Sequence, residues 1–391
     1  MCYNNNHSKK LVGDLMNYKH EKLPLSLEKG ILYLINDKLK EKKEELELFL
    51  QDNKYMNSKE FSKNVLFSQE IKANNTIEGY NDDVGLVYDI LNRKLKISDK
   101  DREQRIRNLY NGYRFIYTDK EINRDNLKKL YSILSRNLLN EEDIKQMSEY
   151  YRKDPVYIFF SSNLDVEPDM GIPAKDLDRY MEEYFNYVNS NNNLNCSTDY
   201  FIKSQIMHFQ LVYIHPYYDI NGRTSRTTSM WYLLNNEVYP YIIFNRAISL
   251  NKKLYYKIIR EVKEYRNVTF FLNYMLDNVK IELEKEYVMD MISSNSSHLS
   301  AVDYQTMYYI LSMNGLLTAK DFITFYNNHN DKKKGIEIYN TMLEPLLDKG
   351  IIIKDRNTDS FINPNKQNFI FKLNKSKFEN NREKIKRLKI K

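Results

Sequence analysis

Glycine and proline, the residues that most often interrupt helices, are scarce in this chain, which has 10 Gly and 8 Pro among 391 residues. The stretches between them combine Leu and Ile with Lys and Glu, which are compatible with helices. So few helix breakers predict a mainly α-helical protein. The length allows two or three domains. An apolar fraction of 42% provides a substantial core and argues against wholesale disorder.

The spacing of apolar residues predicts where these helices lie. In the N-terminal part, apolar residues three and four positions apart predict helices over 28–50, 59–75, 83–94, 102–117 and 125–138. The second ends near Glu78-Gly79, where Gly can take the left-handed conformation of a helix end. A strongly apolar helix follows over 198–214, and another begins at about 222.

Two regions do not follow this helical spacing of apolar residues. Residues 155–163, PVYIFFSSN, are β-branched and aromatic and begin with proline, which predicts an exposed strand or hairpin arm. Near the C-terminus, helices predicted over 302–313, 318–326 and 334–348 precede two strands, GIIIKD and NFIFKL. Three helices followed by a two-stranded wing is the order of a winged-helix domain.

Cysteine, histidine and apolar content limit the class of protein. Two cysteines, Cys2 and Cys196, are too few for a disulfide framework or a thiolate metal cage. His208 lacks enough companion ligands for a metal site, so we expect a packed core histidine. No apolar run reaches the roughly 18 residues that span a bilayer, and no signal-peptide core is visible. We therefore expect a cytoplasmic protein without a membrane partner, although a leaderless secreted effector would share these features.

The net charge of +7 is concentrated at the C-terminus. Residues 372–391 hold nine Lys and Arg against two Glu, so they account for the whole surplus. A basic tail of this kind could contact nucleic acid, but a solvated helical end is the favoured interpretation.

The twelve residues HPYYDINGRTSR, 215–226, form a polar loop between two predicted helices. The first helix ends at His215, because the residue before proline disfavours the helical conformation. Asn221-Gly222 is a strong turn signal, and the second helix begins there. The polar side chains therefore gather at a helix N-terminus.

These side chains suit phosphate chemistry. Arg223 and Arg226 lie one turn apart and join backbone N–H groups in an anion site. Asp219 is the kind of acid that holds Mg²⁺ near phosphates, and His215 is a base that works near neutral pH. Such parts serve phosphoryl or nucleotidyl transfer. The sequence has neither a GxxxxGK(S/T) loop nor a kinase glycine-rich loop.

The loop closely resembles the Fic motif, HPFx(D/E)GN(G/K)RxxR. Seven positions match, and they are His215, Pro216, Asp219, Asn221, Gly222, Arg223 and Arg226. Tyr217 stands where the family usually has Phe. Ile220 stands where it usually has Gly, which brings a side chain to the backbone that approaches the α-phosphate. The resemblance covers about 55–285 and includes a flap-like segment around 155–163.

The resemblance implies a role for each residue of the loop. His215 would take the proton from a target hydroxyl, and Asp219 would hold Mg²⁺ on the α- and β-phosphates of ATP. Arg223 would bind the phosphate chain, and Arg226 the γ-phosphate. Further nucleotide contacts would come from the start of the second helix and from the segment that lines adenine, namely Ile220, Asn221, Gly222, Thr224, Ser225, Asn251 and Tyr255.

Residues 74–79, NNTIEG, resemble the inhibitory motif (S/T)xxxE(G/N) of some Fic proteins. Glu78 and Gly79 match. By resemblance, Glu78 would pair with Arg226 in place of the γ-phosphate, so that ATP binds without its α-phosphorus aligned. Asn74 replaces the hydroxyl residue, so we expect it to hold the helix end less firmly. The structural alternative is a surface Glu beside a helix-ending Gly.

Together these features predict a mainly α protein: a Fic-type helical bundle with a short β-hairpin flap and a small C-terminal winged-helix domain. We expect an N-terminal helical region over 1–120, with the inhibitory helix at about 59–80, and a catalytic core over 121–290. The winged-helix domain is expected over 300–375 and the basic tail over 376–391.

The leading hypothesis is a protein adenylyltransferase that uses ATP and Mg²⁺ to modify a hydroxyl of a target protein. The reverse reaction, removal of AMP, is a variant in which Glu78 positions a water. A rival of another class is a winged-helix DNA-binding regulator with a nucleotide-sensing Fic core. The near-neutral helix GIEIYNTMLEPLLDK argues against nucleic acid as the partner. A homodimer is left open.

Overall fold

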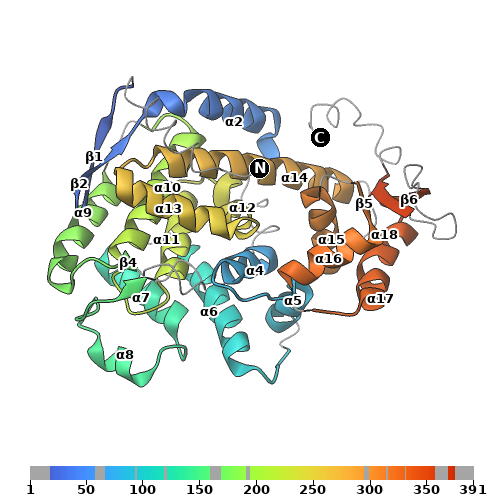
Figure 1. Ribbon diagram of the computed structural model, residues 1–391, viewed down its shortest axis with the longest axis horizontal. Coiled ribbons are helices and arrows are strands. Elements are labelled where there is room, and N and C mark those ends of the chain that lie inside the picture. The colour runs from blue at the N-terminus through green and yellow to red at the C-terminus, as the bar shows by residue number, and fades with distance from the viewer. Residues whose placement is uncertain are drawn as a thin grey trace.

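The computed structural model describes residues 18–57, 67–92, 95–118, 121–158, 169–190, 194–294, 299–313, 316–330, 332–356 and 369–374. They form a mainly helical fold with a few short strands (Figure 1), which confirms the predicted fold class. No helix within these ranges is long and apolar enough to cross a membrane. The predicted basic tail and the first part of the predicted inhibitory helix lie outside the described residues.

A pair of buried helices forms the centre of the fold. α10 (Ser197–Ile214) and α11 (Asn221–Asn235) pack against each other as a helical hairpin. Both are buried on nearly every side, as the apolar sequence of α10 predicts. Inside this core, His208 Nε2 bonds with the Tyr255 hydroxyl at 2.9 Å, and Nδ1 lies 3.3 Å from Gln205 Oε1. His208 is therefore the packed, hydrogen-bonded residue expected.

Further helices surround this pair. They are α2 (Lys40–Asp52), α4 (Phe67–Ile77), α5 (Val84–Asn92), α6 (Lys100–Ile116), α7 (Arg124–Ser135), α8 (Glu141–Gln146), α9 (Leu177–Asn189), α12 (Phe244–Ser249), α13 (Lys252–Tyr265) and α14 (Thr269–Ser294). α6 and α7 approach closely at Gly112, where a Cβ atom would lie 2.7 Å from Leu134 Cδ2. Glycine at this position therefore allows the close packing of the two helices.

The N-terminal end differs from the prediction of one helix over 28–50. The chain instead forms an antiparallel hairpin of β1 (Glu21–Leu27) and β2 (Gly30–Leu34), and α2 begins only at Lys40. Leu25 and Leu27 are buried on one face, which is the period-two pattern of a strand. Gly30 takes a φ of 123° in the turn, a conformation that glycine adopts without steric cost. The prediction was wrong because helical spacing was extended across a glycine turn.

A second hairpin lies at the predicted flap. β3 (Tyr157–Ile158) pairs antiparallel with β4 (Asp169–Met170). Tyr157 and Met170 are 62% and 53% exposed. The described part of the flap is thus an exposed hairpin, as predicted, whereas residues 159–163 lie outside the described residues.

The C-terminal unit has its own hydrophobic core, which also includes the end of α14. Its elements are α15 (Ala301–Ser312), β5 (Leu316–Thr318), α16 (Ala319–His329), α17 (Gly335–Ile338), a π-helical segment (Tyr339–Leu343), α18 (Glu344–Asp348), β6 (Ile352–Arg356) and β7 (Phe369–Leu373). β7 lies between β5 and β6 and is antiparallel to both. The predicted helices and strands are present, and β5 is an additional strand. The winged-helix assignment stays a prediction.

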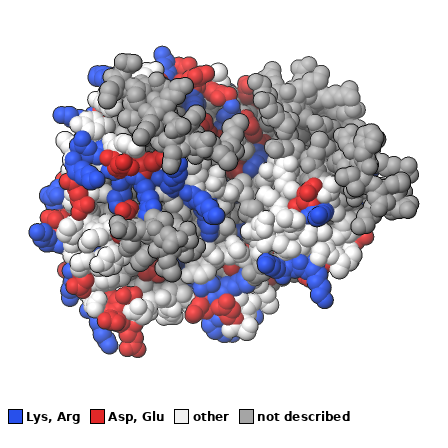
Figure 2. All heavy atoms as spheres, viewed as in Figure 1, with Lys and Arg blue, Asp and Glu red and all other residues white. Residues whose placement is uncertain are grey.

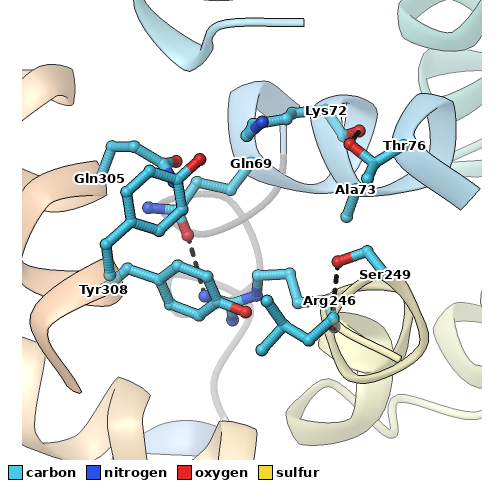
Figure 3. Close-up of a pocket in the computed structure, with 10 residues that line it drawn as sticks. Gln69, Lys72, Ala73, Thr76, Arg246, Ser249, Gln305 and Tyr308 are labelled. Atoms are coloured by element: carbon cyan, nitrogen blue, oxygen red, sulfur yellow. Dashed lines mark hydrogen bonds between the residues drawn. The ribbon is translucent and has the colours of Figure 1, made fainter. Parts of the chain in front are cut away.

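α4 lies between the central core and the C-terminal unit. Lys72 Nζ donates to the Asp82 carbonyl at 2.7 Å and to Asn330 Oδ1 at 2.8 Å. A pocket lies where α4, α12 and α15 meet, and Figure 3 shows Gln69, Arg246 and Tyr308 around it. The helix before Glu78 is therefore anchored on two sides.

A buried charge cluster lies beside this pocket. Arg246 is 2% exposed; its Nη1 pairs with Glu286 Oε2 at 2.7 Å, and its Nε with Glu70 Oε1 at 3.2 Å. Burial raises the pKa of Glu70 to about 8, although Arg246 opposes this shift. Burial therefore favours the protonated form of Glu70, and Glu286 is the carboxylate closer to Arg246.

The surface drawn in Figure 2 carries both signs of charge. Lys and Arg side chains lie beside Asp and Glu side chains, mainly on the left part and along the lower edge of this view, and much of the remaining described surface is uncharged. Such a mixed surface offers no extended basic area of the kind that phosphate backbones attract, as far as the described residues on this face go.

Candidate active site

His215 ends α10 in a left-handed conformation, with φ of 53° and ψ of 59°. Its backbone N–H donates to the Leu211 carbonyl at 3.1 Å, which closes the last turn. The imidazole Nδ1 lies 3.2 Å from the Val212 carbonyl oxygen. Because a carbonyl can only accept, Nδ1 carries the proton and Nε2 is the unprotonated nitrogen.

The electrostatic surroundings keep this imidazole neutral. Burial lowers the pKa of His215 to about 4, and the cation of Arg152 adds to the shift. The Val212 carbonyl and the Glu78 carboxylate act in the opposite direction but do not overcome it. A neutral imidazole at pH 7 can accept a proton from a substrate, which a general base requires.

The loop after His215 is shaped by Asn221 and Tyr217. Asn221 Nδ2 donates to the Tyr217 carbonyl at 2.8 Å, and Asn221 Oδ1 accepts from the Tyr217 N–H at 3.0 Å. The Tyr217 ring is 1% exposed and stacks on Tyr131 with 3.7 Å between ring centroids. Both ends of the Asn221 amide thus bond to the loop itself. The side chain therefore fixes the shape of the loop, and its expected contact with a phosphate stays a prediction.

Asp219 and Ile220 form the tip of the loop. Asp219 is exposed, and its Oδ1 accepts from the Ile220 N–H at 2.6 Å. Ile220 takes a left-handed φ of 66°, which costs a β-branched residue about 1–2 kcal/mol. Its side chain is 2% exposed and belongs to the hydrophobic core, and that burial offsets the strain. Ile220 therefore takes a turn conformation that favours Gly, and its side chain lies in the core.

α11 starts in a way that suits an anion. The N-cap residue Ile220 provides no side-chain hydrogen bond, so the N–H groups of the first turn are not satisfied by a capping side chain. Arg223 is 5% exposed, and its Nε has no hydrogen-bond partner among the described residues. A buried guanidinium beside an uncapped helix N-terminus fits a phosphate group.

Two other predicted phosphate contacts lie inside the fold. Thr224 and Ser225 are both fully buried, and the Ser225 hydroxyl donates to the Gly222 carbonyl at 2.9 Å. The Thr224 N–H donates to the Ile220 carbonyl at 2.9 Å, so the backbone of this residue is also engaged within the fold. The expected contact of Thr224 and Ser225 with a nucleotide stays a prediction.

Arg226, one turn further along α11, is 1% exposed and already paired. Its Nε and Nη2 donate to Asn74 Oδ1 at 3.0 and 2.8 Å, and Nη2 also pairs with Glu78 Oε1. Asn74 Nδ2 in turn donates to the Tyr113 hydroxyl at 3.2 Å. Asn74 was expected to hold the helix end loosely, but it binds Arg226 directly through two hydrogen bonds.

The Glu78 carboxylate lies over the start of α11. A Cβ atom on Gly222 would collide with Glu78 Oε1, so a side chain at this position would displace the carboxylate. Burial acts to raise the pKa of Glu78, but Arg226 and Arg223 outweigh it and hold the pKa below its usual value. Glu78 is thus an ionised carboxylate placed against the arginines of the anion site.

The end of α4 is fixed by α13. Lys252 Nζ donates to the Thr76 carbonyl at 3.1 Å, and the Tyr256 hydroxyl donates to the Ile77 carbonyl at 3.1 Å. Gly79 follows with a φ of 96°, the helix-ending conformation predicted for it. Lys252 and Tyr256 satisfy carbonyls that a helix end leaves unpaired. These two contacts could not be predicted from the sequence, because they join positions 176 and 179 residues apart.

Asn251 and Tyr255 have clear structural partners. The Asn251 side chain accepts from the Leu254 N–H at 3.4 Å and caps α13. Tyr255 is 1% exposed and bonds with His208 in the core. Their expected contact with adenine stays a prediction.

One carboxylate of the loop suits magnesium. The described residues contain no group of three or more His, Cys, Asp or Glu that could hold a metal ion. Mg²⁺ commonly binds through one or two carboxylates together with substrate phosphates and waters. The exposed Asp219, next to the anion site, fits an ion that arrives with a nucleotide.

Part of the chain that includes the loop matches a known family model. Residues 107–233 match the model of the Fic/DOC family, a stretch that contains the whole 215–226 loop but not Glu78. A Fic family protein from Desulfovibrio desulfuricans has a similar structure, with 18% identity, a TM-score of 0.50, and coverage of 86% of this chain and 94% of that one. The similarity to that structure supports the fold.

Two further Fic structures match less closely. Fic-1 from C. elegans shows 17% identity and a TM-score of 0.45; the match covers 58% of this chain and 64% of that one. A Fic domain containing signaling protein from Bacteroides thetaiotaomicron shows 11% identity and a TM-score of 0.38; the match covers 65% of this chain and 95% of that one.

Proposed function

Because residues 107–233 carry a Fic domain, whose family members commonly transfer AMP to proteins, we propose that this protein is a protein adenylyltransferase. It moves AMP from ATP to a hydroxyl side chain of a target protein. The observation that carries the proposal is the placement of a neutral His215 one short loop before an uncapped helix N-terminus with a buried arginine. A base and an anion site so close together are the two parts that nucleotidyl transfer needs.

In this proposal the target hydroxyl attacks the α-phosphorus. His215 Nε2 accepts the hydroxyl proton as the new oxygen–phosphorus bond forms. The bond from the α-phosphorus to the bridging oxygen breaks, and pyrophosphate leaves. The first-turn N–H groups of α11 and Arg223 stabilise the charge that builds on the phosphate oxygens. Mg²⁺, held by Asp219, would neutralise charge on the α- and β-phosphates.

We further propose that Glu78 inhibits this reaction. Its carboxylate occupies Arg226, the residue assigned to the γ-phosphate, and Asn74 holds the same guanidinium from the other side. ATP that enters the site must displace Glu78 before its triphosphate can extend to Arg226. The α-phosphorus is therefore out of line for attack while the contact lasts.

Removal of AMP from a modified protein is the second candidate. The observation that favours it is the ionised Glu78 in the electrostatic field of His215, because a carboxylate there can orient a water for hydrolysis. Transfer and removal of AMP would use the same loop. They differ in the role of Glu78, which would block transfer but assist removal.

The experiment is AMP transfer from labelled ATP to proteins of a cell lysate. His215→Ala should lower the transfer rate about 10²–10⁴-fold, the usual contribution of a general base, while ATP binding persists. His20→Ala, an exposed histidine next to β1, is the matched control and should leave the rate unchanged. Full transfer by His215→Ala would refute the assignment of the base. Loss of AMP from a modified protein, without any transfer to one, would favour the second candidate.

A further inference from the structure

Arg152 follows α8 and precedes the flap, and it is almost completely buried, with 2% exposed. Its Nε donates to the His215 carbonyl at 2.8 Å, and its Nη1 donates to the Asp154 carbonyl at 2.7 Å. Nη2 donates to the Ile172 carbonyl, and the Arg152 backbone N–H donates to the Pro216 carbonyl at 2.9 Å. One residue thus joins the start of the flap, the end of the flap and the catalytic histidine.

The guanidinium has no carboxylate within ion-pair distance in the described part of the chain. Its charge is balanced by the dipoles of three carbonyl groups. Burying a charge in this way is costly, and burial lowers the pKa of Arg152 to about 10. The group is still protonated at neutral pH, so a cation is maintained beside His215 without a counterion.

Two neighbours strengthen the same junction. The Tyr218 hydroxyl accepts from the N–H groups of Lys153 and Asp154 at 3.1 and 3.2 Å. At the other end of the flap, a Cβ atom on Gly171 would lie 2.8 Å from Arg152 Nη2 and 3.4 Å from His215 Cβ. Both ends of the flap are therefore in direct contact with the catalytic loop.

We propose that Arg152 is a positioning residue that fixes the flap hairpin relative to His215. This inference rests on the proposed transferase activity. A target segment that adds a strand to the exposed flap edge is placed by main-chain hydrogen bonds. The distance from its hydroxyl to His215 Nε2 then depends on how the flap is attached to the histidine. Since Arg152 is that attachment, it governs the alignment of the hydroxyl and not the binding of ATP.

The charge of Arg152 provides a second, measurable consequence. Burial is the largest cause of the lowered pKa of His215, and the cations of Arg152 and Lys263 lower it further. The Val212 carbonyl and the Glu78 carboxylate raise it. Replacing Arg152 with a neutral side chain should therefore raise the His215 pKa and move the acid limb of the pH–rate profile to higher pH. A residue with only a packing role would not produce this shift.

The test uses the full chain in the Glu78→Gly background, with self-modification by labelled ATP as the readout. Arg152→Lys and Arg152→Gln should lower kcat by about 10²-fold, the effect of a misplacement of about 1 Å, while KM for ATP changes little. Arg179→Lys, at an exposed arginine of α9, is the matched control and should change neither value. An unchanged kcat in both Arg152 variants would overturn the proposal. So would a loss of ATP affinity as large as the loss of kcat.

Histidine NMR makes this test independent of the reaction. The His215 signal, assigned by its absence in His215→Ala, should titrate at higher pH in Arg152→Gln than in the parent protein. If Glu78→Gly transfers no AMP, the transferase proposal fails. The titration still tests the contact between Arg152 and His215. A raised pKa of His215 in Arg152→Gln supports this contact, and an unchanged pKa refutes it.

Discussion

Replacing Glu78 by glycine tests the inhibitory contact most directly. The Glu78–Arg226 pair joins an arginine side chain that is 1% exposed to a glutamate side chain that is 25% exposed. An exposed ion pair stabilises a protein by up to about 1 kcal/mol. Breaking a fully buried ion pair destabilises it by about 3–5 kcal/mol. We therefore take about 2 kcal/mol as the free energy of the Glu78–Arg226 pair, which the γ-phosphate must overcome to bind Arg226. At about 1.4 kcal/mol per factor of ten, this corresponds to a roughly 30-fold increase in the rate of AMP transfer.

The assay is the initial rate of AMP incorporation from labelled ATP. Glu78→Gly should be roughly 30-fold faster than the wild type, chiefly in kcat. Glu78→Gln should be intermediate, because the amide keeps the shape of the carboxylate without its charge. Glu28→Gly, in the exposed turn between β1 and β2, controls for the loss of a glutamate elsewhere.

The same variant should also be less stable. Without Glu78, the buried Arg226 loses its ionic partner, so the melting temperature should fall, and added ATP should restore part of it. Greater activity with lower stability is the combined signature of a released contact. If Glu78→Gly is no faster than the wild type, residues 74–79 are an ordinary helix end and the inhibitory role must be abandoned.

Other variants test the remaining assignments. Asn74→Ala removes two hydrogen bonds to a buried guanidinium, so the free energy of unfolding measured by chemical denaturation should fall by about 2–4 kcal/mol. A fall below about 0.5 kcal/mol, the lower end for one ordinary hydrogen bond, would show that these bonds are dispensable. Asp219→Ala should abolish the dependence of transfer on Mg²⁺, and an unchanged magnesium titration would contradict the assignment. In the Glu78→Gly background, Arg226→Ala should weaken the binding of ATP more than that of ADP, and calorimetry with equal losses would remove Arg226 from the γ-phosphate. Glu70→Gln tests how stability depends on pH. The pKa of Glu70 in the folded protein is raised from 4.5 to about 8. Its contribution to the free energy of unfolding is therefore fully present below pH 4.5 and is lost as the pH rises to 8. Wild type should therefore lose more stability than Glu70→Gln across that window, and parallel curves would contradict the raised pKa.

The conformation of the 215–226 loop was predictable because its sequence signals are local. The His215-Pro216 step ends one helix, the Asn221-Gly222 pair begins the next, and few residues separate them. What the sequence could not show is the direction of the Ile220 side chain. A large residue in a glycine position suggested interference with a phosphate, whereas the structure buries that side chain in the core.

Contacts between distant segments account for the other differences. Asn74 was judged by its unusual side chain, but its role depends on Arg226, which lies 152 positions away. Arg152 drew no notice, because an arginine in a polar segment is unremarkable until the fold brings carbonyls around it. The β1–β2 hairpin was missed for a local reason, since apolar residues near helical spacing also fit a strand when a glycine turn divides them.

The burial of α4 limits how the proposed inhibition by Glu78 can be released. Eight consecutive residues, from Glu70 to Ile77, are buried, and Lys72 bonds to the C-terminal unit. Swinging this helix away would expose all of them, whereas freeing Arg226 requires only that the partly exposed Glu78 side chain rotate. Exposed side chains rotate in picoseconds to nanoseconds, while displacements of packed helices take microseconds to milliseconds or longer. Inhibition by Glu78 should therefore follow nucleotide concentration without a lag, and a progress curve should be linear from its first turnover.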